Sequence, residues 1–316
     1  MSFSSKIKSE LQSLKHLNCC NKAELSAMLH INGSIEKSAN SISIIFQSTN
    51  NAVVRRFMHL VKQLYDIEMT ILKKEMKKLR KHDLFVIKIE DKVDYLLTDL
   101  SLINENAIFF QDVDESLIER ECCKKAYLRG VFMASGSINS PDTSAYHLEI
   151  QTFSLKQAEV IQSICDEFSL NAKITKNRRG FIAYIKEAER IADFLRVIGA
   201  NNSLFEFEDS RIKRDFKNSI NRVINCDIAN EKKAMDAANK QLEYIRIIET
   251  KNINNLSKSV KEAIFLRKTY PEASLSELSY VSTEHFDKAI SKSALNHRFR
   301  AIKDIANKIL IEEGRK

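Results

Sequence analysis

Two stretches of the chain are near copies of each other. Residues 19–35 read CCNKAELSAMLHINGSI, and residues 122–138 read CCKKAYLRGVFMASGSI. The copies lie 103 positions apart and are identical at eight of seventeen positions. A match of this density between distant segments predicts an internal duplication, in which each copy belongs to one structural unit.

The repeated segment has the pattern of a helix. In the second copy Ala126, Gly130 and Ala134 recur at every fourth position, which predicts a stripe of small residues on one helix face. Such a stripe lets two helix backbones approach closely, so the two copies are expected to pack together as a pseudo-twofold seam. The glycine after each helix, Gly33 or Gly136, is expected to be a left-handed C-terminal cap.

The segments that follow the two copies also correspond. Each copy is followed by an alternating run, a helical pattern, a second alternating run and a closing helix. The alternating runs are residues 42–48 and 85–89 in the first half, and 147–152 and 181–185 in the second. Period-two alternation predicts sheets with one buried face. The expected fold class is α+β, with two αββαββα halves and a C-terminal all-helical domain.

Composition sets limits on the protein class. The chain has 316 residues, of which 44% are hydrophobic and 29% charged, so it is too apolar to be disordered. Six glycines and two prolines indicate a helix-rich fold, and no glycine-rich nucleotide loop is present. The charged N-terminus lacks an apolar signal region, and no apolar run approaches eighteen residues. We therefore expect a cytoplasmic protein without membrane contact.

Positive charge is concentrated toward the C-terminus. The chain carries a formal charge of +8, and residues 251–316 supply thirteen Lys or Arg against eight Asp or Glu, a net +5. A local excess of this kind predicts a nucleic-acid-binding module.

Four of the six cysteines form two adjacent pairs, Cys19–Cys20 and Cys122–Cys123. Zinc ligands normally lie two to four residues apart, and neighbouring side chains point in different directions, so the pattern argues against a zinc site. We expect reduced, buried structural thiols that pack as small hydrophobic groups. Neither a metal nor a cofactor is predicted.

The C-terminal sixty residues show three short helical patterns. The first spans residues 257–270 and stops at Pro271; the second opens at residues 274–277, which form a capping-box sequence. The third runs from about residue 291 to 311 and carries one apolar stripe: Leu295, Phe299, Ile302, Ala306 and Ile309. Three short helices with a basic last helix predict a helix-turn-helix.

The N-terminal part of that last helix is the expected reader of DNA, within a site at about residues 274–307. Arg pairs with guanine and Asn with adenine in the major groove, so Asn296, His297 and Arg300 are assigned to base edges. Phosphate contacts are assigned to Ser291, Lys292, Ser293, Arg298 and Lys303. The alternative is an ordinary amphipathic helix with a solvated charged face.

The repeat resembles a known motif. Residues 128–136, LRGVFMASG, resemble the LAGLIDADG motif of homing endonucleases, and residues 25–33, LSAMLHING, resemble it more weakly. The whole chain resembles the bacterial WhiA family of sporulation and cell-division regulators, which combine this double repeat with a C-terminal helix-turn-helix. The stretches that carry this resemblance are residues 122–138, 146–150, 198–200, 205–208, 218–222, 225–226 and 291–298.

The resemblance to the nucleases fails at one position in each copy. In active homing endonucleases a carboxylate just before the final glycine holds the catalytic Mg²⁺, but Asn32 and Ser135 stand at these positions here. Neutral side chains leave the metal charge uncompensated, so the resemblance implies a DNA-binding shape without catalysis.

Lys176, Arg178 and Arg179 lie in a predicted hairpin turn, residues 173–180, and are candidate phosphate contacts of the repeat. A solvated turn is the alternative interpretation of these charges.

The predicted domains are residues 1–110 and 111–210 for the two repeats, 211–255 for a helical connector with a hinge at 251–255, and 256–316 for the helix-turn-helix. The resemblance implies a non-enzymatic transcriptional regulator that binds double-stranded DNA at the nucleoid and acts in cell division, chromosome segregation or sporulation. One alternative is a scaffold that uses the LAGLIDADG-like domain to recruit another transcription factor or RNA polymerase. The other is an active endonuclease, against which Asn32 and Ser135 argue.

Overall fold

The structure, a computed structural model, describes residues 1–38, 41–74, 83–103, 113–143, 145–251, 255–286 and 288–312. The chain divides into two units, Met1–Arg214 and Asp215–Lys316. The division falls inside one long helix, α8 (Asn201–Thr250).

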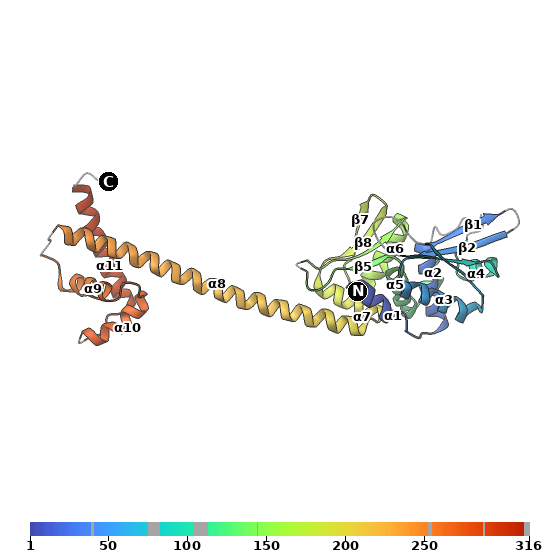
Figure 1. Cartoon of the computed structure of the whole chain (residues 1–316), viewed down its shortest axis with the longest axis horizontal. Coiled ribbons are helices and arrows are strands. Elements are labelled where there is room, and N and C mark those ends of the chain that lie inside the picture. Colours follow the sequence, from blue (N-terminus) through green and yellow to red (C-terminus); the bar gives the residue numbers. More distant parts are fainter. Residues whose placement is uncertain are drawn as a thin grey trace. The chain divides into compact units, whose positions relative to one another are not determined.

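The first unit contains two halves of the same design (Figure 1). Helix α1 (Phe3–Leu11) precedes them, and a short 3-10 helix, η1 (Glu115–Ile118), lies between them. The first half consists of α2 (Asn18–Asn32), β1 (Gly33–Ser38), β2 (Ser41–Ser48), α3 (Asn51–Tyr65), β3 (Thr70–Lys74), β4 (Leu84–Ile89) and α4 (Val93–Asp99). The second half consists of α5 (Glu121–Ser135), β5 (Gly136–Ile138), β6 (Leu148–Thr152), α6 (Leu155–Glu167), β7 (Lys173–Asn177), β8 (Gly180–Ile185) and α7 (Ala188–Ile198).

Each half forms a four-stranded antiparallel sheet. The strand orders are β1-β2-β4-β3 and β5-β6-β8-β7, so the two sheets have equivalent topology. In β6 the residues Leu148, Ile150 and Thr152 are buried, and the intervening Glu149 and Gln151 are half-buried. The period-two alternation in the sequence therefore marked the core face correctly, and the predicted αββαββα order is confirmed.

The repeated helices α2 and α5 pack against each other and also contact the first two strands of their own halves (Figure 1). Small residues make this contact possible. A methyl group on Gly130 would meet the backbone oxygen of Glu24 and lie 2.7 Å from Cβ of Ala27. The predicted seam of small residues is therefore present.

The predicted left-handed caps are wrong. Gly33 and Gly136 have φ values of −88° and −69°, which are ordinary extended backbone, and each begins a strand immediately after its helix. The chain turns so sharply from helix to strand that a Cβ on Gly33 would meet the backbone of Leu29, and one on Gly136 would meet Phe132. Glycine is required here for space and not for its backbone handedness.

The C-terminal unit is a small helical bundle with its own core. It contains α9 (Lys258–Thr269), α10 (Leu275–His285) and α11 (Lys292–Glu312). Both arms of the predicted capping box are present, because Ser274 accepts from the backbone of Glu277 and Glu277 accepts from the backbone of Ser274. Helix α10 runs on to His285 and so includes the first polar residues after Val281.

The apolar stripe predicted for the last helix forms the centre of this bundle. All five of its members are buried: Leu295, Phe299, Ile302, Ala306 and Ile309. They pack with residues of α9 and α10, and with Ile245 and Ile248 near the end of α8.

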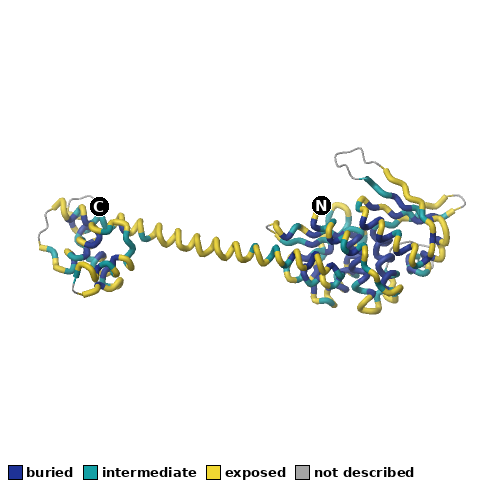
Figure 2. The backbone as a smooth tube through the Cα atoms, turned by 60° about the horizontal axis from the view of Figure 1, so that its bottom comes forward, coloured by how far each residue is buried: buried dark blue, intermediate teal, exposed yellow. Residues whose placement is uncertain are grey.

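Helix α8 is exposed over its middle. From residue 215 to 237 every position except the half-buried Ala234 is exposed (Figure 2). The sequence predicted helix for residues 211–249, and the structure extends it back to Asn201. The predicted hinge, 251–255, lies largely outside the described residues, because 252–254 are not described. No helix in the described parts of the chain is long and apolar enough to cross a lipid bilayer.

Candidate nucleic-acid interface

The face of α11 opposite its buried stripe is polar and exposed. Asn296, His297 and Arg300 are all exposed, and so is Lys303 one turn later. These positions share the outer side of the helix because residues three and four apart are neighbours on a helix surface. Ser291, Lys292 and Ser293 are exposed at the start of the same helix. The structure thus gathers most of the predicted contacts on one surface.

Two of the predicted phosphate contacts have internal roles. Arg298 is half-buried, and its guanidinium donates to the carboxylate of Glu262 on α9 at 2.7 Å. This pairing holds α11 against α9, and we remove Arg298 from the DNA-binding surface. Ser291 Oγ accepts from the backbone N–H of Ala294 at 3.2 Å, so this side chain caps the helix.

A buried arginine that the sequence analysis missed fixes the turn before α10. Arg267 is 1% exposed and donates to the backbone oxygens of Tyr270, Pro271 and Ala273. Its Nε donates to the side chain of Gln241, and its guanidinium lies 5.4 Å from the ring centre of Phe299. Burial lowers the pKa of Arg267 to about 10, which still leaves it charged at neutral pH. The signal in the sequence was the position of Arg267 within an otherwise amphipathic helix.

The predicted hairpin turn in the repeat is present between β7 and β8. Lys176, Arg178 and Arg179 are exposed there, and the Asn177 side chain accepts from the backbone of Arg179 at 2.7 Å. The outer face of the same sheet places Lys173, Tyr184 and Glu149 in register. This face therefore mixes positive, negative and aromatic groups, and the hairpin is its most basic part.

The positions before the two seam glycines are used for internal hydrogen bonds. Asn32 Nδ2 donates across the seam to the backbone oxygen of Ala134 at 3.2 Å. Ser135 Oγ donates to the backbone oxygen of Gln151 at 2.7 Å. Both side chains act as donors to carbonyl groups, a role that an ionised carboxylate does not fill. Neither contact was evident from the sequence.

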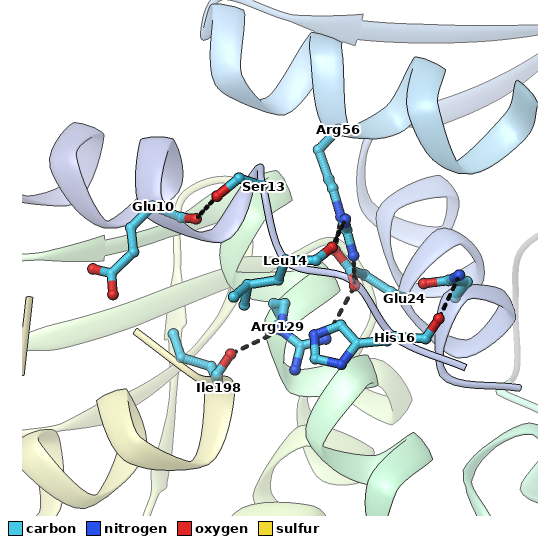
Figure 3. Close-up of polar contacts among 9 residues, drawn as sticks. Glu10, Ser13, Leu14, His16, Glu24, Arg56, Arg129 and Ile198 are labelled. Carbon is cyan, nitrogen blue, oxygen red and sulfur yellow. Dashed lines mark hydrogen bonds and ion pairs between the residues drawn. The ribbon is translucent and has the colours of Figure 1, made fainter. Parts of the chain in front are cut away.

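A buried cluster of charges lies farther along the seam (Figure 3). The Glu24 carboxylate accepts two hydrogen bonds of 2.7 Å from Arg56 and one of 3.1 Å from Arg129. Arg56 also donates to the backbone oxygen of Leu14, and Arg129 donates to that of Ile198. All three charged side chains are at most 4% exposed. The two arginines and one glutamate leave a net positive charge, which the carbonyl oxygens help to stabilise.

His16 lies beside this cluster. Its pKa is lowered from the ordinary value, chiefly by burial and next by the positive charge of Arg129; Arg56 adds to this shift, while Glu24 opposes it. His16 is therefore held neutral over more of the pH range than a solvated histidine.

The four paired cysteines meet in space, contrary to the geometric argument from the sequence. The two sulfurs of Cys19 and Cys20 are 4.0 Å apart, and those of Cys122 and Cys123 are 3.9 Å apart. All four sulfurs lie within 4.8 Å of one another. The expectation of buried thiols holds for Cys20 and Cys123, but Cys122 is exposed and Cys19 is half-buried. The four sulfurs converge because the packing of α2 against α5 brings the two cysteine pairs together.

The fold and the surfaces described above define a class of protein with paired LAGLIDADG-like halves followed by a helix-turn-helix domain. Family models confirm each part: the WhiA N-terminal LAGLIDADG-like domain matches residues 18–103, the WhiA LAGLIDADG-like domain 124–217, and the WhiA C-terminal HTH domain 220–306. The chain belongs to the WhiA family.

Relatives and solved structures agree with this assignment. The chain is 42% identical to proteins named probable cell division protein WhiA from Bacillus cereus strain AH187 and from Bacillus anthracis strain CDC 684. Each alignment covers 98% of this chain and 97% of the relative. The crystal structure of full-length WhiA from Thermatoga maritima is 24% identical, with a TM-score of 0.58 and coverage of 98% of this chain and 99% of that one. A WhiA N-terminal LAGLIDADG domain structure is 25% identical, with a TM-score of 0.51 and coverage of 63% and 90%.

Proposed function

We propose that the protein is a sequence-specific regulator that binds double-stranded DNA through α11 and does not cut it. The observation that carries the proposal is the exposed polar face of α11, on which Asn296, His297 and Arg300 lie opposite a fully buried apolar stripe. Asn and Arg offer the paired hydrogen bonds that distinguish adenine and guanine in the major groove.

The surrounding residues suit phosphate contacts. Lys292, Ser293 and Lys303 flank the proposed base-reading residues, and the start of α11 adds backbone N–H donors. The match to the WhiA HTH domain supports this assignment. The hairpin residues Lys176, Arg178 and Arg179 are proposed as additional phosphate contacts of the repeat.

The biological setting follows from the relatives. Their name, probable cell division protein WhiA, supports a role in cell division, which we extend to chromosome segregation and, in spore-formers, to sporulation. We place such a regulator in the cytoplasm, at the nucleoid. Asn32 and Ser135 serve as internal hydrogen-bond donors, and this supports loss of the nuclease activity that the fold carries elsewhere.

Binding by the full chain to duplexes selected from a random pool tests the DNA-binding proposal. Arg300→Ala should reduce discrimination at one base pair by about 1–3 kcal/mol, while Lys303→Ala should weaken all sequences and reduce the magnitude of the salt slope by about 1. Lys308→Ala, an equal loss of charge near the other end of α11, is the matched control. Equal effects of Arg300→Ala and Lys308→Ala on base preference would contradict the assignment.

A second candidate function, recruitment of another transcription factor or RNA polymerase, is favoured by exposed apolar side chains on α8. Phe216, Ile220, Ile224 and Ile228 follow one another at every fourth position and are each at least 42% exposed. In the full chain, Ile220→Asp combined with Ile224→Asp should abolish polymerase or regulator capture and leave DNA affinity unchanged if this function holds. Unchanged capture would refute it.

A further inference from the structure

The four cysteines at the start of the seam form a site that the DNA-binding function does not use. Cys19 and Cys20 are the second and third residues of α2, and Cys122 and Cys123 are the second and third residues of α5. Each half thus contributes the same pair from the same helical position. Cys20 and Cys123 pack with Ala23 and Ala126 in a small cluster of their own.

The spacing of the sulfurs is that of ligands around a single metal ion. Zinc bound by four thiolates is tetrahedral with Zn–S bonds of about 2.3 Å, which places neighbouring sulfurs about 3.8 Å apart. Within the two pairs the observed separations are 4.0 Å and 3.9 Å, and no separation among the four exceeds 4.8 Å. A cluster of several irons spreads its cysteine ligands over different metal atoms and requires a wider arrangement.

The electrostatic surroundings suit an anionic tetrathiolate centre. Two helices begin at the site, and neither has a side-chain hydrogen bond at its N-cap residue, Leu17 or Arg120. The positive ends of both helix dipoles therefore face the sulfurs. Lys22, Lys124 and Lys125 follow the cysteines, but each is paired with a carboxylate, of Asp99, Glu167 and Glu121 respectively, so the helix ends provide the positive potential at the sulfurs.

We propose that Cys19, Cys20, Cys122 and Cys123 bind one zinc ion that ties the two halves of the repeat together. Four protein thiolates leave no open coordination position, so the site is structural and not catalytic. It lies at the opposite end of α2 from Asn32, about 18 Å away along the helix. Zinc thus has a role here that is separate from the Mg²⁺ site of the nucleases.

Metal analysis of the full chain tests this proposal. The protein is produced in zinc-supplemented medium and purified without chelators or metal-affinity resin, and its metals are measured by mass spectrometry. We expect one zinc ion per chain. Cys122→Ser, which changes the exposed ligand, should lose the zinc, and Cys226→Ser, an exposed cysteine on α8, should retain it.

A second measurement uses the wild-type chain, so its result does not depend on whether a cysteine variant folds. Cobalt exchanged into the wild-type chain should give the intense visible bands and sulfur-to-metal charge transfer of tetrahedral thiolate coordination, and a strong zinc chelator should lower Tm. Absence of stoichiometric metal with four freely alkylated thiols would overturn the proposal. Iron with acid-labile sulfide, or full zinc retention in Cys122→Ser, would overturn it as well.

Discussion

Replacement of Glu24 by glutamine is expected to destabilise the N-terminal unit severely. Glu24 is fully buried and accepts three hydrogen bonds from Arg56 and Arg129. The neutral amide leaves two buried guanidinium groups facing each other and turns an N–H₂ group toward their donors. Loss of one partner from a buried ion pair costs about 3–5 kcal/mol. This cost is a large part of the free energy of unfolding of a typical domain, about 5–15 kcal/mol.

Calorimetry of the full chain measures this effect. A unit of about 200 residues changes its Tm by about 2–4 °C per kcal/mol, so Glu24→Gln should lower the transition of this unit by about 6–20 °C. The matched control is Glu206→Gln, which removes the same charge from a pair with Lys6 whose side chains are 45% and 49% exposed. That surface pair should contribute less than about 1 kcal/mol. If Glu24→Gln shifts Tm no more than Glu206→Gln does, the buried cluster does not stabilise the N-terminal unit as predicted.

Three further predictions concern the seam. Gly130→Ala should lower the urea midpoint, because overpacking of about 1–3 kcal/mol against Glu24 and Ala27 exceeds the helix-propensity gain of about 1 kcal/mol; a higher midpoint would count against the close contact. Asn32→Asp loses the donor to Ala134 and should cost about 1–3 kcal/mol without creating Mg²⁺-dependent cleavage, and any specific cleavage would refute the second part. His16 has a folded pKa below its unfolded value, so its contribution to stability is complete above about pH 6.5 and is lost as pH falls toward the folded pKa. His16→Gln should therefore show a smaller loss of unfolding free energy than wild type between about pH 7.5 and about pH 5.5, and parallel curves would disprove this assignment.

The sequence predicted the features that local pattern controls. The repeat at residues 19–35 and 122–138 indicated two matched halves, because a duplicated helix implies that the strands and helices around it are duplicated too. The capping box at Ser274 and the stripe through Leu295 placed α10 and α11, because hydrogen bonding and burial there follow helical periodicity.

Features that depend on contacts between distant segments were missed. Glu24 bonds Arg56 32 residues away and Arg129 105 residues away, and no local pattern links them. The role of Gly33 was misjudged because a sharp turn into a strand and a left-handed cap both call for glycine. The convergence of the cysteines depends on the crossing of α2 and α5, which places one pair against the other.

The buried charges also affect which halves can pair across the seam. Tyr127 occupies, 103 positions later, the place that Glu24 has in the first half. Two copies of the second half would place Arg129 against Tyr127 with no acid to accept its charge, whereas two copies of the first would keep each Glu24–Arg56 pair and place Ser26 where Arg129 stands. Self-pairing of the second half is therefore disfavoured, and its buried arginine favours the unlike partner that the same chain supplies.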